Sequence, residues 1–390
     1  DASDDSESEF KAFVEIFHKH DIIKKEELTK ELFQLISEIS NNHRRSTDFF
    51  NKILQIFHFI FDNKELPISQ TEIYLIYSSN KAILYLLLDQ ELLIPNETIL
   101  DNILSKEKNQ LHYFLFSKLK KYLEKEKILQ IEKEIKEKYD EDLESFDKKC
   151  QIGENDSYVC QLIRNDSVEE FVSYVTRTNL SHSSRILPSI YETNLYLTEN
   201  KPSLIEYAAF FGSIQIFQYL RYNNVKFTDS LWIYAIHSNN AELIHILEEI
   251  HSESIKENCK EVVKESIKCH HNNICDYLKD HFLPQSNENR LDKEFDLCII
   301  KSHNYKYYPD NICYLFENPR YNDGFNIPNL SKNYTTITIP SGTTRIYDQI
   351  FYDCSSLTKI VIPSSVTSIG NNVFEECVSL KEISIPPSVT

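Results

Sequence analysis

The stretch CHHNNIC contains the densest group of soft metal ligands in the chain. Cys269, His270, His271 and Cys275 are residue types that bind Zn²⁺ through thiolate sulfur or imidazole nitrogen. Zinc sites generally show CxxC-type pairs, however, and adjacent residues on a helix point in different directions. We therefore expect no metal site and no cofactor here, and we interpret the stretch as the turn of a helical hairpin.

No other group of residues has a spacing that indicates catalysis. The segment HKHD (18–21) ends an amphipathic pattern, where histidine is favourable beside helix C-terminal carbonyls. The chain has no Gly-x-Ser-x-Gly, HExxH or Cys–His signature, and its carboxylates are dispersed. Its five glycines lie far apart, so no phosphate-binding glycine loop can form. We expect a protein that is not an enzyme and has no catalytic residues.

The charge balance narrows the choice of partners. With 42 basic and 60 acidic residues the formal net charge is −18, which argues against nucleic acid and anionic lipid as ligands. The acidic start, DASDDSESEF, does not resemble a signal peptide, and the apolar run AILYLLL is too short to insert in a membrane. Nine scattered cysteines indicate reduced thiols. These features predict a cytoplasmic protein.

The first part of the chain is predicted to be helical. Residues 1–9 carry five carboxylates and are expected to be disordered, and residues 10–149 form a helical region. Within it, SQTE at 69–72 has the pattern of a capping box. An i, i+4 apolar stripe predicts one long helix over 111–143.

Residues 150–316 contain a repeated pattern of helix, tight turn and helix. The first clear copy, SLIEYAAFFGSIQIFQYLRYNNV, has Ala208 where two helices must approach closely and Gly212 at the turn. The second copy has Ala235 and Asn239 at these places, and the third has Ser266. The spacings are irregular, at 27 (235 − 208) and 31 (266 − 235) residues. EFDLCIIKSHNY (294–305) looks like the first helix of a fourth copy.

These units resemble ankyrin repeats, because SLIEYAAFFGSIQIFQYL corresponds to the TPLHLAA–GHLEVVKLLL core of that family. SLIE replaces TPLH, and the 33-residue period is not kept. The segment is similar to the divergent ankyrin-type domains that occur in large families in parasitic protists. The resemblance implies a protein-binding face made from the turns and the first helices.

The resemblance also gives candidate partner-binding residues: Phe210 and Phe211 in the first unit, and His237 and Ser238 in the second. The two phenylalanines stand where the family usually has polar residues, so they are candidates for an aromatic anchor. The alternative is that both rings pack against preceding helices, as large aromatic side chains usually do.

A second, strictly periodic array follows a predicted linker over 317–336. The Ile-Pro pairs at 339, 362 and 385 are each 23 residues apart, and phenylalanine, cysteine and leucine recur at the same interval. LTKIVIP and LKEISIP are predicted strands with alternate residues facing a core and a proline at the end. Each coil can bury its apolar face only by stacking on another coil.

Residues 337–390 resemble BspA-like leucine-rich repeats, whose signature is IP-SVTSIG–xxF–C-SLKxI. The chain stops at IPPSVT, part-way through a third coil, so we expect a fragment of a longer protein with further coils. Cys354 and Cys377 fall at the same place on successive coils. Because equivalent side chains point in parallel, we expect stacked thiols rather than a disulfide.

The sequence therefore predicts an α-helical repeat solenoid of ankyrin type followed by a short β-rich leucine-rich-repeat solenoid. The predicted function is a non-enzymatic scaffold for a protein partner. The alternative is a cell-surface adhesion antigen, the role usually proposed for BspA-like repeats, with its export signal outside these residues.

Overall fold

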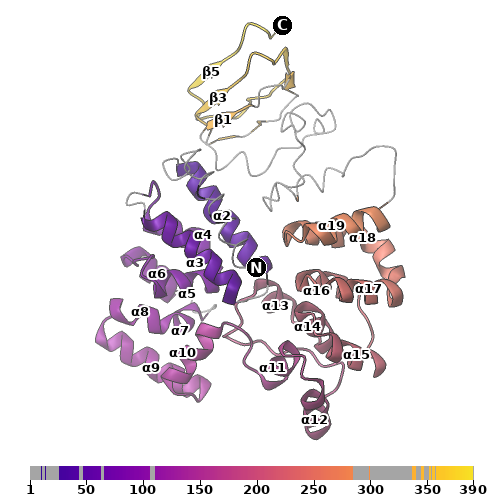
Figure 1. The fold of residues 1–390 in the computed structure, drawn as a ribbon. Helices are drawn as coiled ribbons and strands as arrows, with labels where there is room; N and C mark the ends of the chain where they lie inside the picture. The colour runs from indigo at the N-terminus through magenta and orange to yellow at the C-terminus, as the bar shows by residue number, and fades with distance from the viewer. Residues whose placement is uncertain are drawn as a thin grey trace. The chain divides into compact units, whose positions relative to one another are not determined.

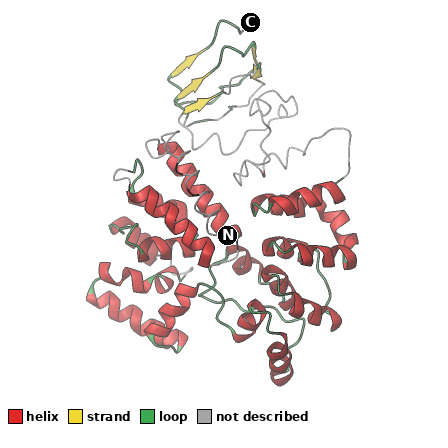
Figure 2. Ribbon diagram, in the orientation of Figure 1, coloured by secondary structure: helices red, strands yellow, loops and turns green. Residues whose placement is uncertain are grey.

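The computed structural model describes residues 10, 14, 26–43, 47–62, 66–105, 110–283, 298, 336–339, 344–346, 351–352, 354–355 and 357–389. The chain divides into two compact units, Asp1–Gln285 and Ser286–Thr390. The described residues of the first unit are mainly helical, and the strands β1 to β5 all belong to the second (Figures 1 and 2). The predicted fold class is confirmed at this level. The predicted acidic tail, the HKHD segment, the fourth helical copy apart from Cys298, and nearly all of the linker lie outside the described residues.

The first half of unit one is a set of helices around one apolar core. The core contains Phe33, Phe57, Tyr77, Leu87 and Ile135, all fully buried. Its helices are α2 (Glu26–Asn42), α3 (Thr47–Asp62), α4 (Gln70–Tyr77), α5 (Lys81–Asp89), α6 (Glu97–Ser105), α7 (Leu111–Phe114), α8 (Phe116–Leu119), η3 (Lys120–Tyr122), α9 (Lys125–Tyr139) and α10 (Leu143–Ile152).

The capping box predicted at 69–72 is confirmed. The backbone N–H of Glu72 donates to the Ser69 hydroxyl, and the backbone N–H of Ser69 donates to the Glu72 carboxylate at 2.8 Å. These two bonds satisfy donors that the first turn of α4 would otherwise leave unpaired.

The single helix predicted over 111–143 is wrong. The chain breaks at Leu123, whose backbone is extended, and a new helix begins at Lys125. The cause is the phase of the apolar stripe. Leu119 and Ile131 are both buried but are twelve residues apart, which in one straight helix would place them about 120° from each other. The break lets α8 and α9 both face the core.

The second half of unit one contains the predicted helical hairpins. Gly212 and Asn239 end the first helices of two hairpins with φ of +70° and +51°, as the repeat pattern predicts, and His270 takes the same place in the third with φ of +55°. The small residues Ala208, Ala235 and Ser266 are fully buried. The helices are α11 (Tyr158–Arg164), α12 (Val168–Thr178), α13 (Leu195–Asn200), α14 (Leu204–Phe211), α15 (Ile214–Tyr222), α16 (Leu231–Ser238), α17 (Ala241–Ile250), α18 (Ser252–Lys268) and α19 (Asn272–Phe282).

The first helices of successive hairpins pack side by side, in the order α11, α14, α16, α18. Helix α2 joins the two halves of this unit, because it packs against α4 on one side and against α13 and α18 on the other. The carbonyls at its C-terminal end accept hydrogen bonds from Asn194 and His237. The beginning and the end of the helical unit are therefore in direct contact (Figure 1).

In the second unit, strands that are 23 residues apart in the sequence pair in parallel. Strands β1 (Thr336–Thr338), β3 (Lys359–Val361) and β5 (Glu382–Ser384) form one sheet, in which Ile360 pairs with Ile337 and Ile383. Strands β2 (Arg345–Ile346) and β4 (Ser368–Ile369) form a second. Each pair is 23 residues apart, so the predicted period is confirmed as the sheet register.

The inward side chains of this unit are covered unequally. Ile360 and Ile362 are 2% and 7% exposed, whereas their equivalents one repeat later, Ile383 and Ile385, are 39% and 55% exposed. The inward alternation predicted for LTKIVIP is confirmed by burial. In LKEISIP the register places Ile383 on the same face as Ile360, but no described coil covers β5.

Candidate functional site: a buried histidine, glutamate and thiol

Three chemically active side chains meet at the inner helices of the hairpins. His237 of α16, Glu265 of α18 and Cys269, which directly follows α18, are all buried. The His237 Nε2 atom lies 3.0 Å from a Glu265 oxygen, and its Nδ1 atom lies 2.9 Å from the Asn42 carbonyl oxygen. The Cys269 sulfur lies 3.5 Å from Nδ1 and 4.0 Å from Nε2.

The hydrogen bonds define the charges in this cluster. Burial alone would raise the pKa of Glu265, but hydrogen bonding and positive charge from His237 and Lys268 outweigh it and hold the pKa well below its usual range. Lys268 Nζ also lies 2.9 Å from the second carboxylate oxygen. Both ring nitrogens of His237 thus face oxygen atoms, the Asn42 carbonyl at the C-terminal end of α2 and the Glu265 carboxylate.

Aromatic rings enclose the imidazole. Tyr196 and Phe210 both stack on His237, with ring centroids 4.6 and 5.0 Å away. The two rings cover the imidazole and exclude water from it. The arrangement gives a buried imidazole held in one orientation by its two hydrogen bonds.

Two further histidines lie next to this cluster. The rings of His43 and His271 meet edge to face at 4.9 Å. Burial, together with the neighbouring histidines, lowers the pKa of His43 to about 4 and that of His271 to about 3, so both are neutral near pH 7. His271 is 6% exposed, and its Nε2 atom has no hydrogen-bond partner.

The predicted group CHHNNIC is only partly brought together. Among the described residues, the side chains able to share a metal ion are His237, Glu265 and Cys269, whose ligand atoms lie within 4.8 Å of one another. Cys275 is buried on α19 and is not part of this set. The sequence therefore points to Cys269 but does not connect it with its two neighbours from other positions.

The four residues predicted to bind a partner have different environments. Phe210, His237 and Ser238 are buried, at 0%, 1% and 4% exposed, whereas Phe211 is half-buried. The Ser238 hydroxyl donates to the Ala235 carbonyl within its own helix. Phe211 packs against Phe210 and lies beneath the Arg164 guanidinium, 5.9 Å from its ring centroid. The structure brings Phe210 and His237 together as a stacked pair, and Phe211 keeps the only solvent-facing ring among these four residues.

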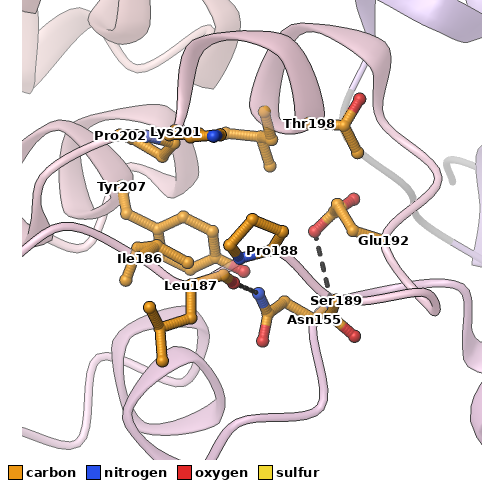
Figure 3. A pocket seen from close by; sticks show the side chains of 11 residues that line it. Asn155, Ile186, Leu187, Pro188, Ser189, Glu192, Thr198, Lys201, Pro202 and Tyr207 are labelled. Atoms are coloured by element: carbon orange, nitrogen blue, oxygen red, sulfur yellow. Dashed lines mark hydrogen bonds between the residues drawn. The ribbon is translucent and has the colours of Figure 1, made fainter.

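A second buried acid lies beside a small cavity. Glu192 is 5% exposed and accepts hydrogen bonds from the backbone N–H groups of Asn155 and Asn194, at 3.2 and 2.9 Å. Burial raises the pKa of Glu192 to about 7, although these two hydrogen bonds oppose the rise. Figure 3 shows its carboxylate facing Asn155, on the wall of a cavity of about 10 Å³ that Pro188 and Tyr207 also line. That volume admits at most about one water molecule.

Sequence reasoning missed Glu192, Glu265 and His43 as members of these clusters. Each is a single polar residue in an otherwise ordinary segment, and its partners lie on other helices. Only Glu265 could have been found from the sequence. It stands three residues before Lys268 and one before the small residue Ser266, which places it on the closely packed first helix of a hairpin.

Comparisons with known proteins identify the second unit. Residues 329–390 match the family described as BspA type leucine rich repeat region (6 copies). The match supports the resemblance of this region to BspA-like leucine-rich repeats that its motifs predict. No curated protein and no solved structure matches the chain. Within the described residues, no helix has the length and apolar content that a membrane crossing requires.

Proposed function

We propose that this protein is a non-enzymatic scaffold that binds a protein partner through stacked repeats, ankyrin-like in the helical unit and leucine-rich in the C-terminal unit. The observation that carries the proposal is the match of residues 329–390 to a leucine-rich-repeat family, together with their 23-residue parallel register. Repeat arrays of this kind present extended surfaces that are suited to other proteins.

Two surfaces are available for such a partner. In the second unit, the sheet exposes Lys359 and Val361 on neighbouring outward positions of β3, with Val361 41% exposed. In the helical unit, Phe211 keeps part of its ring in contact with solvent. An aliphatic side chain flanked by charge is a reasonable contact at the rim or centre of an interface.

The test is affinity capture from lysate of the source cells with the full chain as bait. Val361→Glu and Phe211→Ala are the two variants, and Leu129→Ala, a change at an isolated exposed leucine, is the control. We expect a reproducible partner that binds the wild type and the control, and that is lost with one of the two variants. Failure to enrich any protein over the bead control, or equal binding to all variants, contradicts the proposal.

Phe210 and Phe211 allow a role in core packing to be distinguished from a role in partner binding. Because Phe210 is fully buried against His237, Phe210→Ala should lower the free energy of unfolding by about 3–5 kcal/mol. Phe211→Ala should cost clearly less. Urea unfolding followed by the fluorescence of Trp232, the single and fully buried tryptophan, measures both. Equal losses would show that Phe211 is also a core residue and remove it as a binding candidate.

A second candidate function is a cell-surface adhesion antigen, which the BspA type match favours. The two candidates differ in location. If the scaffold acts inside the cell, an antibody against the second unit should label cells after permeabilisation but not intact cells. If the protein is displayed on the surface, the antibody should also label intact cells. Labelling of intact cells would favour the adhesion role over the scaffold proposal.

A further inference from the structure

The buried side chains of His237, Glu265 and Cys269 place their ligand atoms within 4.8 Å of one another, close to the separations of ligands on one metal ion. Ligand atoms on a tetrahedral zinc lie about 3.3–3.8 Å apart, which follows from bonds of about 2.0–2.3 Å. Here the Nε2 and carboxylate oxygen atoms are 3.0 Å apart, and Nε2 and the thiol sulfur are 4.0 Å apart. We propose that these three side chains form a binding site for a single divalent transition-metal ion, with zinc as the best match.

The surroundings hold two of the ligands as protein metal sites usually do. Metal-binding histidines typically donate their other ring N–H to a backbone carbonyl, which fixes the tautomer and the ring orientation. The His237 Nδ1 atom has this contact with the Asn42 carbonyl, so Nε2 is the nitrogen directed at Glu265 and the ion. Lys268 similarly holds the carboxylate oxygen that would not bind the ion.

Charge balance favours the exchange of protons for an ion. Without metal, the 3.0 Å contact between Nε2 and the Glu265 oxygen needs one proton between the two atoms, so the imidazole–carboxylate pair has no net charge, and the thiol is neutral. On binding, the proton on Nε2 and the proton of the thiol leave to water, so a 2+ ion meets one carboxylate, one thiolate and a neutral imidazole. The group is neutral before and after the exchange, apart from Lys268, so no net charge is buried.

His271 lies outside the group of three close ligand atoms, but a movement of its side chain would make it a candidate fourth ligand. It follows Cys269 by two residues, its ring hydrogen-bonds to the backbone of His237, and its buried Nε2 atom has no hydrogen-bond partner. A buried polar atom without a partner costs free energy, and a metal bond would remove that cost. The resulting set of two nitrogens, one oxygen and one sulfur suits zinc better than magnesium or calcium, which prefer oxygen ligands alone.

The site can be tested with Co²⁺ as a spectroscopic substitute for zinc, on the full chain after treatment with a chelator. We expect one Co²⁺ per chain and a sulfur-to-cobalt charge-transfer band that added Zn²⁺ abolishes. Cys269→Ser should lose the band, and Cys275→Ser, a change at a buried thiol of the neighbouring helix, should keep it. Absence of a band in the wild type, or an identical band in both variants, overturns the proposal.

A second variant covers the case in which Cys269→Ser does not fold. Glu265→Gln keeps the size of the side chain and removes its charge, and we expect it to weaken Zn²⁺ binding at least tenfold. The readout is the zinc concentration that gives half of the rise in melting temperature, followed by Trp232 fluorescence. If Zn²⁺ leaves the melting temperature of the wild type unchanged, or stabilises Glu265→Gln at the same concentration, the cluster is a metal-free ion pair and the proposal is wrong.

Discussion

Glu192 illustrates how burial changes the chemistry of a single residue. Its two backbone hydrogen bonds favour the charged form, but its burial favours the protonated form more strongly. The pKa is about 7 in the folded chain and near 4.5 in the unfolded chain, so only the folded chain keeps the proton between these values. The free energy of unfolding therefore falls as pH rises through this window, by up to roughly 3 kcal/mol.

The first prediction is that Glu192→Gln removes this pH dependence, because an amide does not ionise. Absolute stability should change as well, since the amide N–H₂ would face one of the backbone donors that Glu192 now accepts from. The useful readout is the difference between urea unfolding at pH 4.5 and at pH 7.5, followed by Trp232 fluorescence. The exposed substitution Glu199→Gln is the control. A wild-type pH slope in Glu192→Gln would contradict the assignment.

At the scale of residues, the sequence identifies some members of the buried cluster but not their relation. His237 and Cys269 are both singled out by their positions in the repeated hairpins, one as a surface contact and the other as a doubtful metal ligand. Glu265 is 28 residues from His237 and His43 is much further, so no local pattern joins them. Their meeting depends on the packing of α2, α16 and α18.

At the scale of elements, the predictions from sequence are confirmed where a short stretch of residues determines the local structure. The left-handed residues after the first helices, the capping box of α4 and the 23-residue register all follow from short-range chemistry. The prediction of one long helix at 111–143 is wrong although each half of the apolar stripe does form a helix. The angle between the buried faces of the two halves is set by the core that they share, and no local pattern contains it.

The second unit offers a comparison of the same residue on successive coils. Ile360→Ala should lower the stability of this unit by about 2–4 kcal/mol, because the side chain is buried between strands on both sides. Ile383→Ala should cost less than half as much, because its side chain is 39% exposed. Alkylation of the buried Cys354 thiol at increasing urea concentrations measures the opening of this unit. Equal losses from the two substitutions would contradict the unequal cover of the coils.

At the scale of the helical unit, α2 connects residues from distant parts of the sequence. The Asn194 side chain donates to the carbonyls of Asn41 and His43 and also caps α13. We predict that Asn194→Ala raises amide hydrogen exchange in 26–43 and in 265–271, and leaves α5 unchanged. Mass spectrometry of the exchanged peptides checks this prediction.

Asn240→Ala is the matched control for that experiment. Asn240 caps α17 through the same type of bond, and its amide donates to the Gly212 carbonyl and not to a carbonyl of α2. Loss of either cap should cost about 1 kcal/mol locally, so a difference between the two variants at 26–43 reports the contact with α2 alone. If both variants loosen α2 equally, α2 is held by apolar packing and not by its C-terminal hydrogen bonds.

The contact between Asn42 and His237 has a consequence for synthesis of the chain. The two residues are 195 positions apart, and translation at 5–20 residues per second separates their appearance by roughly 10–40 s. During that interval α2 has left the ribosome, but the α16 imidazole that binds its last carbonyls does not yet exist. Helix α2 is therefore made well before it can reach its final hydrogen bonding.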